Sequence, residues 1–298
     1  MSRHTTQLPL AGHTALVTGV SRRRGIGHAV AAALLDMGAS VFVHHFARHD
    51  HDQRWGADDL DALLEGLGER VAPGARLGEA DADLSDAGTV EPLLSAARSL
   101  TGSLDILVCN HALSGHDGSI LDMDAARLDA HWDTNSRSTL LLTAGFARGL
   151  AGGRQCPALP GERTPRPDAG AGAGAARVPL GKVFWMTSGQ VHSPMRGEVA
   201  YAASKAALAG VTRTVAAELL DLGIVLNTID PGPVNTGYLD PATTDRGAEQ
   251  VAELLAATPF GRFGDPSDPA HLIAWLASDE GSWVVGQVLT SDGGFSTV

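Results

Sequence analysis

Short apolar runs alternate along this chain with longer amphipathic stretches. The apolar runs predict strands at Thr14–Thr18, Ser40–His45, Arg76–Ala82, Leu104–Cys109, Lys182–Thr187, Ile224–Ile229 and Gln287–Thr290. The stretches between them predict helices at Gly25–Met37, Arg54–Leu67, Ser85–Leu100, Asp124–Leu150, Glu198–Leu222 and near Pro269–Leu276. Strands that alternate with helices of this length indicate right-handed crossovers and a parallel sheet with helices on both faces.

One long segment has no apolar periodicity. Residues 152–179 are rich in Gly, Ala, Pro and Arg, and structureless loops of this length are uncommon inside compact domains. We expect a flexible surface insert between a helix and the strand that follows it. A crossover helix runs antiparallel to the strands, so the insert should lie at the amino edge of the sheet, away from ligands at the carboxyl edge.

The composition narrows the class of protein. Of 298 residues, 44% are hydrophobic and 19% are charged, which suits one large α/β domain or two small ones. The net charge of −12 and pI of about 5.3 argue against a general binder of nucleic acids or anionic membranes, because those partners need a basic face. Two cysteines make no disulfide framework, and no apolar segment has the pattern of a secretion signal or membrane span. We therefore expect a cytoplasmic location.

The segment after the first predicted strand has the pattern of a phosphate-binding turn. It reads Thr18-Gly-Val-Ser-Arg-Arg-Arg-Gly-Ile-Gly27, so a glycine turn joins a strand to a helix. Glycine allows the backbone to approach a pyrophosphate, and the start of a helix offers unpaired N–H groups and the positive end of a dipole. An ordinary glycine-rich turn is the alternative, because the spacing is not G-x-G-x-x-G.

The tip of the second strand favours NADP over NAD. An acid there binds the ribose 2′-hydroxyl of NAD, whereas an arginine binds the 2′-phosphate of NADP. The tip falls near His45 and Phe46, with Arg48 following and Arg22 to Arg24 in the facing loop. Four arginines around one expected phosphate in an acidic protein favour NADP(H). Asp50 and Asp52 keep NAD(H) open.

Tyr201 and Lys205 lie four residues apart, which places them on one face of the predicted helix. A free phenol has a pKa of about 10, and a nearby ammonium lowers it toward the range of useful acid–base chemistry. Ser188 ends the fifth predicted strand, thirteen residues before Tyr201, at the edge where a substrate carbonyl is expected. The spacing of Tyr and Lys alone is common, so the serine strengthens the pattern.

Other polar residues carry weaker signals. His44, His45, His49 and His51 cluster with Asp50 and Asp52, but a polar strand end explains them better than a metal site, and we predict no metal. Cys109 is expected to be a small strand-end residue, and His111 and His192 to be pocket walls or surface groups.

Taken together, these motifs resemble the classical short-chain dehydrogenase/reductase family over nearly the whole chain, from about Leu10 to Phe295 except the insert. The closest style is that of 3-oxoacyl-thioester reductases. The matches in order are the turn Thr18–Gly27, Asp83-Leu84, Asn110, Asn135, Ser188, Tyr201, Lys205, the loop Pro231–Thr236 and the ending from Gly286 to Gly294. Two motifs depart from the family pattern. Five residues rather than three separate Gly19 from Gly25, and Cys109–Ala112 stands where the family has Asn-Asn-Ala-Gly.

The resemblance implies a Rossmann-type, doubly wound α/β fold: one domain with a parallel seven-stranded sheet in the order 3-2-1-4-5-6-7. It implies a catalytic tetrad of Asn135, Ser188, Tyr201 and Lys205, with Tyr201 as general acid and Asn135 holding a water that relays protons through Lys205. The predicted cofactor-binding residues are Gly19, Ser21, Arg22, Arg23, Arg24, Gly25, Ile26, Gly27, Phe46, Arg48, Asp83, Leu84, Asn110, His111, Ala112, Tyr201, Lys205, Pro231, Gly232, Val234 and Thr236.

The function implied is an NADP(H)-dependent interconversion of a ketone and a secondary alcohol. An NAD-dependent alcohol or sugar dehydrogenase of the same family, or a catalytically silent cofactor-binding regulator, is the alternative. The segment Thr236–Phe263 should decide the small-molecule substrate, and its Tyr238, Leu239 and Phe260 indicate a partly apolar pocket. By resemblance, the helices predicted at Asp124–Leu150 and Glu198–Leu222 pack subunits together in a homodimer or homotetramer.

Overall fold

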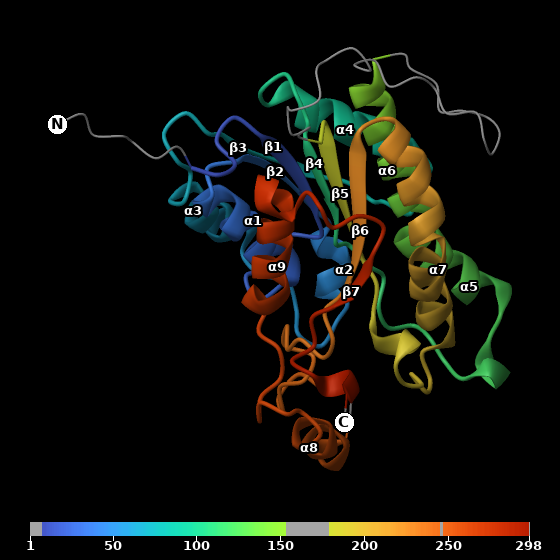
Figure 1. The fold of residues 1–298 in the computed structure, drawn as a ribbon. Coiled ribbons are helices and arrows are strands. Elements are labelled where there is room, and N and C mark those ends of the chain that lie inside the picture. The colour runs from blue at the N-terminus through green and yellow to red at the C-terminus, as the bar shows by residue number, and fades with distance from the viewer. Residues whose placement is uncertain (1–7, 153–178, 245–246, 298) are drawn as a thin grey trace.

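The computed structural model describes residues 8–152, 179–244 and 247–297. Its centre is a parallel sheet of seven strands in the order β3-β2-β1-β4-β5-β6-β7 (Figure 1). The strands are β1 (Thr14–Thr18), β2 (Ser40–His45), β3 (Leu77–Asp81), β4 (Ile106–Cys109), β5 (Gly181–Met186), β6 (Ile224–Asp230) and β7 (Val288–Thr290). The helices are α1 (Ile26–Asp36), α2 (Ala47–His51), α3 (Leu60–Gly68), α4 (Val90–Ser99), α5 (Ala125–His131), α6 (Ser138–Ala151), α7 (Val199–Asp221), α8 (Ala248–Ala256) and α9 (Ser267–Ala277). The predicted fold class and strand order are confirmed.

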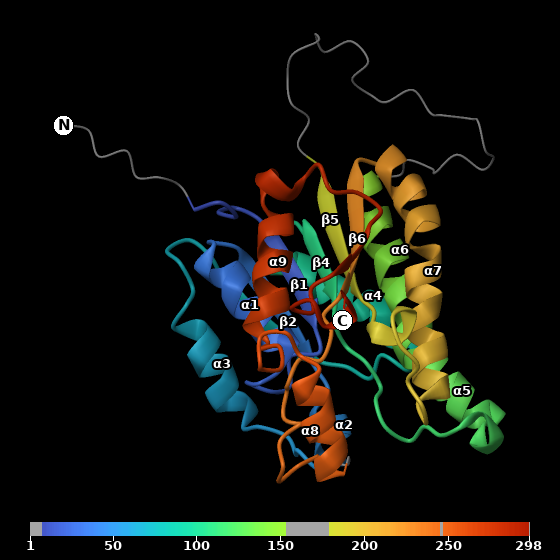
Figure 2. The ribbon, with the colours of Figure 1, turned by 60° about the horizontal axis from the view of Figure 1, so that its bottom comes forward.

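Helices cover both faces of the sheet (Figures 1 and 2). Successive residues of a strand point to opposite faces, so β1 sends Ala15 and Val17 into the core under α1, α3 and α9, and Leu16 into the core under α4, α6 and α7. Helices cover the apolar core on each face of the sheet. The central strands are therefore continuous apolar runs rather than alternating apolar and polar residues. Among the described residues, no helix is long and apolar enough to cross a membrane.

The long helix predicted at Asp124–Leu150 is interrupted. It consists of α5, a π-helical segment at Trp132–Arg137, and α6. Such segments insert an extra residue into the helical ladder and change which side chains face inward. Here the π-helical segment turns Asn135 and Ser136 into the buried interior.

Other predicted boundaries shift for local reasons. The helix predicted from Arg54 begins only at Leu60, because the Asp59 side chain accepts a hydrogen bond from Ala62 N and caps the helix there. The short helices α2 and α8 were not predicted. Helix α2 has only five residues, and the nine residues of α8 lie in the segment that was interpreted as deciding the substrate.

The predicted insert lies outside the described residues except at its two ends. Gly152, at φ 55°, ends α6 in the left-handed conformation that glycine adopts readily. Pro179 leads into β5, so both ends lie at the amino edge of the sheet. The turns after β1, β2, β4, β5 and β6 emerge at the opposite, carboxyl edge. The strand order reverses between β1 and β4, which is where open α/β sheets bind ligands.

Candidate active site

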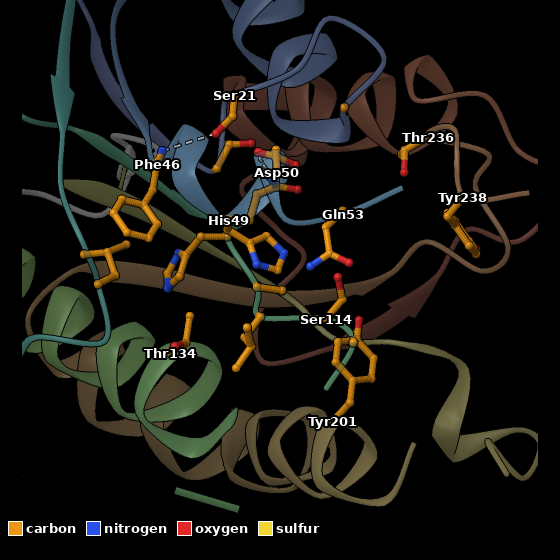
Figure 3. Close-up of a pocket in the computed structure, with 18 of the residues that line it drawn as sticks. Ser21, Phe46, His49, Asp50, Gln53, Ser114, Thr134, Tyr201, Thr236 and Tyr238 are labelled. Atoms are coloured by element: carbon orange, nitrogen blue, oxygen red, sulfur yellow. Dashed lines mark hydrogen bonds between the residues drawn. The ribbon is translucent and has the colours of Figure 1, made fainter. Parts of the chain in front are cut away.

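A cavity of about 1030 Å³ opens along the carboxyl edge of the sheet (Figure 3). The predicted site residues that line it are Gly19, Ser21, Arg22, Gly25, Ile26, Phe46, Arg48, Asp83, Leu84, Asn110, His111, Ala112, Ser188, Tyr201, Pro231, Gly232, Val234 and Thr236. Five predicted residues are not among its lining: Arg23, Arg24, Gly27, Asn135 and Lys205. The cavity therefore runs from the end of β2, past the glycine turn, to Tyr201.

The glycine turn can accept a pyrophosphate. Helix α1 begins after Gly25 with no side-chain cap and no acidic residue in its first turn, so its first N–H groups are available to an anion in the cavity. Gly27 lies just behind, and a Cβ there would come within 2.4 Å of Gly19 O. The tight packing of Gly19 and Gly27 keeps the turn closed, and the residues present fit the phosphates of a dinucleotide.

His44 fixes this turn from β2, a role that sequence reasoning missed. Gly19 N donates to His44 Nδ1 at 3.2 Å, and His44 Nε2 donates to Ala82 O at 2.8 Å. Burial lowers the pKa of His44 to about 4, so the ring is neutral near neutral pH and Nδ1 remains an acceptor. The histidine cluster seen in the sequence does not converge, because His45 turns to Glu79 Oε2 at 2.7 Å. Among the described residues, no three His, Cys, Asp or Glu side chains are placed to hold a metal ion.

His111 is part of a buried hydrogen-bond chain rather than a simple pocket wall. Its Nδ1 lies 2.7 Å from Thr18 Oγ1 and its Nε2 lies 2.7 Å from Ser138 Oγ. Ser138 Oγ donates to Thr134 O, so it accepts from His111 Nε2–H, and Nδ1 accepts from the Thr18 hydroxyl. Burial lowers the pKa of His111 well below its usual value, which keeps the ring neutral. The imidazole that replaces the family's small residue thus ties β1 to α6. Asn110 Nδ2 donates to Thr18 O and Gly19 O at 3.0 and 3.1 Å.

The structure separates the four arginines that the sequence grouped around one phosphate. Arg22 donates to Thr236 O at 2.7 Å, pairs with Asp50 at 3.1 Å and stacks over Trp55 at 5.2 Å. Arg24 is exposed and pairs with Asp240 at 2.5 Å. The exposed Arg23 is held by its backbone N–H, which donates to Asp58. Arg23 and Arg24 are thus exposed and lie outside the cavity lining, and the structure gives no support to their predicted contact with the phosphate.

Within the described part of the chain, Arg48 lines the cavity and forms no ion pair with a carboxylate. It stands over the Phe46 ring at 5.6 Å. Phe46 N donates to Ser21 Oγ at 3.2 Å, which joins the tip of β2 to the glycine turn (Figure 3). Asp83 and Leu84 lie on the same wall after β3, and Asp83 Oδ1 accepts from Ser85 N at 2.9 Å.

Tyr201, Ser188 and Lys205 meet at the other end of the cavity. Ser188 follows β5, and its hydroxyl contacts Met195 Sδ at 3.9 Å and is near enough to the Tyr201 phenol to lower the pKa of that phenol. Lys205 Nζ lies 5.8 Å from the centre of the Tyr201 ring and donates to Met186 O at 3.1 Å. The lysine is 2% exposed, so it sits behind the tyrosine rather than on the cavity wall.

The electrostatics of this group differ from the expected lowering of the phenol pKa. Burial raises the pKa of Tyr201, and the Ser188 hydrogen bond offsets only part of that rise. Burial also lowers the pKa of Lys205 to about 8. In the protein by itself, Tyr201 therefore remains a protonated phenol at neutral pH, which is the form of a proton donor.

The Asn135 side chain is fully used by protein contacts. Its Oδ1 accepts from Leu113 N at 2.6 Å, and its Nδ2 donates to Leu113 O at 3.1 Å and Ser204 Oγ at 3.0 Å. These contacts hold the loop after β4 against α7. The structure thus gives Asn135 a part in shaping the site, while its predicted water relay stays a prediction.

The loop after β6 contributes Pro231, Gly232, Val234 and Thr236 to the cavity lining. Asp230 is 1% exposed, and His192 Nε2 lies 3.4 Å from its Oδ2. Tyr238 lines the cavity as predicted for the substrate segment. Leu239 is instead buried, and Phe260 is 76% exposed outside the cavity lining, so these two do not form the apolar pocket expected of them.

Several lining residues gave no signal in the sequence. They are Gln53, Trp55, Ser114, Gly115, His116, Asp117, Thr134, Met195 and Glu198. They come from the segment after α2, from the loop after β4, from the π-helical segment and from the segment before α7. Only the topology brings these segments together.

Comparison with known proteins agrees with this geometry. A family model described as enoyl-(acyl carrier protein) reductase matches residues 19–155 and 172–296. The uncharacterized oxidoreductase YjdA of Bacillus subtilis is 32% identical over 94% of this chain and 96% of its own length. A cyclohexanol dehydrogenase of a Rhodococcus species is 32% identical over 98% of this chain and 99% of its own. A short-chain dehydrogenase of Burkholderia cenocepacia, solved in complex with NADP, is 27% identical with a TM-score of 0.74, covering 96% of this chain and 99% of that one. The chain belongs to the short-chain dehydrogenase/reductase family of oxidoreductases.

Proposed function

We propose that this protein is an NADP(H)-dependent oxidoreductase that interconverts a ketone and a secondary alcohol, with Tyr201 as general acid and base. The observation that carries the proposal is the meeting of Tyr201, Ser188 and Lys205 at one end of a cavity whose other end is a phosphate-binding turn. A cofactor spanning that cavity places its reactive end beside Tyr201.

In the direction of reduction, each side chain has a separate task. The Ser188 hydroxyl, which lies near the Tyr201 phenol, orients the substrate carbonyl. Tyr201 donates its proton to the carbonyl oxygen as that oxygen gains negative charge. The Lys205 ammonium stabilises the resulting phenolate from behind the ring. A bound NADPH supplies the hydride that completes the reduction.

The preference for NADP(H) rests on Arg48. It is exposed at the tip of β2, on the cavity wall, where a 2′-phosphate is expected. The NADP complex of the Burkholderia relative is consistent with this preference. Against it, Asp50 and Asp52 also line the cavity, although Asp50 is already paired with Arg22. An NAD-dependent alcohol dehydrogenase is therefore the second candidate.

The substrate class is proposed from a relative and from the cavity together. The Rhodococcus relative is named for cyclohexanol, a cyclic secondary alcohol. Leu113, Met195 and Tyr238 give the cavity a partly apolar wall near Tyr201. A panel of cyclic and open-chain ketones is the first set to test, with enoyl thioesters included because of the family model's description.

Binding titrations test the cofactor assignment. We expect Arg48→Ala to weaken NADPH binding by about 10- to 100-fold, because a charge-assisted contact to phosphate contributes about 1.5–3 kcal/mol. Binding of NADH should change less than about twofold, since it lacks the 2′-phosphate. Arg23→Ala is the matched control, because Arg23 is exposed and not part of the cavity lining. Equal losses for NADPH and NADH would refute the 2′-phosphate role.

Turnover assays distinguish the proposed oxidoreductase from the alternative, a catalytically silent cofactor-binding regulator. NADPH oxidation that depends on a ketone, with the alcohol as product, is expected. Tight NADPH binding without product formation across the panel would favour a cofactor-binding regulator.

We retain the proposal of a homodimer or homotetramer packed through α5 to α7. Exposed apolar side chains on these helices support it: Leu128 at 42%, Trp132 at 45%, Val211 at 37% and Leu220 at 39%. Burial of such side chains between subunits would remove apolar surface from water.

A further inference from the structure

The helix that carries Tyr201 and Lys205 is capped by a residue far away in the sequence. Helix α7 follows Glu198, which makes no side-chain cap to the helix. The Asp117 carboxylate, in the loop after β4, instead accepts from Ala200 N at 3.0 Å and from Tyr201 N at 2.7 Å. These are the second and third N–H groups of the helix, which a local cap would normally bind.

The carboxylate is enclosed and fully engaged. Its side chain is 5% exposed, and Oδ1 also accepts from Gly118 N at 2.8 Å. His131 Nε2, itself 1% exposed, lies 3.9 Å from Oδ2. A buried carboxylate is unfavourable unless hydrogen bonds and positive potential compensate it, and here three N–H groups and the start of a helix provide both.

The loop reaches this position through a strained backbone. Gly115 and His116 have φ of 76° and 52°, and a side-chain-bearing residue in the left-handed region is unfavourable unless its surroundings hold it there. At the other end of the loop, Asn135 binds both backbone groups of Leu113. Ser114, Gly115 and His116, between the two anchors, line the cavity.

We propose that Asp117 is a positioning residue. It sets the place of Tyr201 relative to the substrate wall, which is the cavity-lining part of the loop after β4 at Ser114, Gly115 and His116. One carboxylate joins the backbone of Tyr201 to the loop that forms this wall, so the proton donor and the wall move together. The inference rests on the proposed function, because it concerns the geometry in which Tyr201 meets a carbonyl. Small displacements of a reacting group lower rates strongly, so loss of the anchor should slow hydride transfer.

Asp117→Asn tests the anchor with little change in shape. The amide keeps Oδ1 for Gly118 N and Ala200 N but presents an NH₂ group to Tyr201 N, which removes that bond. Asp117→Ala removes all three hydrogen bonds, to Gly118 N, Ala200 N and Tyr201 N. Asp59→Ala is the matched control, because the Asp59 carboxylate also accepts an N–H at the start of a helix, that of Ala62 in α3, and does not line the cavity.

Two measurements are needed. The first is the single-turnover rate of ketone reduction per bound NADPH, with the NADPH Kd measured in parallel. The second is hydrogen exchange at the Ala200 and Tyr201 amides, which needs no activity. We expect Asp117→Asn to slow the single turnover about tenfold or more, to leave the Kd within about twofold, and to speed exchange at Tyr201 about tenfold. Asp59→Ala should change none of these. If Asp117→Asn only reduced the fraction of folded protein, the number of NADPH-binding sites would fall but the single-turnover rate per bound NADPH would not.

The outcomes are decisive. An active wild type with an Asp117→Asn rate within twofold of it overturns the positioning role. Unchanged amide exchange overturns the anchor itself, whether or not turnover is detected. A wild type that reduces no carbonyl overturns the proposed function, and the positioning role with it, although faster exchange in Asp117→Asn would still establish the anchor.

Discussion

The buried ammonium of Lys205 should leave a measurable trace in the pH dependence of stability. Burial lowers its pKa from 10.5 to about 8 in the folded protein. Each pKa unit corresponds to about 1.4 kcal/mol, so keeping Lys205 charged in the fold costs about 3 kcal/mol relative to the unfolded chain. Between pH 8 and 10.5 the unfolded chain binds this proton while the folded protein has released it. The contribution of Lys205 to stability therefore rises as pH rises through that window.

Lys205→Met isolates the effect because it removes the titrating group while keeping a similar length. Urea unfolding of both proteins, followed by tryptophan fluorescence from pH 7 to pH 10.5, gives the difference in unfolding free energy. Buried Lys182, whose pKa burial also lowers to about 8, cancels in this difference because both proteins contain it. We expect the wild type to gain about 3 kcal/mol relative to Lys205→Met across the window. A difference that stays flat would refute the desolvation of Lys205.

Three further variants test the glycine turn, helix α7 and the assembly. Gly27→Ala should destabilise the protein by about 1–3 kcal/mol and weaken NADPH binding, because its Cβ would lie 2.4 Å from Gly19 O. Gly210 lies in the exposed middle of α7, and a Cβ added there would meet no other atom within 4 Å. Gly210→Ala should therefore raise the free energy of unfolding, measured in urea, by about 0.4–1 kcal/mol. Trp132→Lys should lower the oligomeric mass measured by light scattering, and an unchanged mass would exclude this surface as the interface.

Much of the fold was predictable because its central strands β1, β2, β4, β5 and β6 are buried on both faces. Strands such as Leu104–Cys109 are short apolar runs that only a covered parallel sheet accommodates. The π-helical turn at Trp132–Arg137 was not predictable, since its sequence has no proline or glycine to mark a break. The order of the motifs similarly indicated Ser188, Tyr201 and Lys205, because their spacing is fixed by the strand and helix that carry them.

The parts of the site that depend on side-chain partners were not predictable. Arg22 and Arg24 pair with Asp50 and Asp240, and these pairs join segments that lie far apart in the sequence. The role of His111 needed Ser138, 27 residues away, and that of Asp117 needed the start of α7, 84 residues away. Such contacts follow from the topology and not from local sequence.

The central claim is that the Tyr201 phenol exchanges the proton during carbonyl reduction. Tyr201→Phe removes only the hydroxyl, so the packing around the ring and the phosphate-binding turn should stay unchanged. The decisive measurement is kcat of this variant with NADPH and the best ketone, beside its NADPH Kd. We predict that kcat falls by about 10²- to 10⁴-fold while the Kd stays within a few-fold of the wild type. A folded Tyr201→Phe protein with wild-type Kd and near-wild-type kcat would contradict the account.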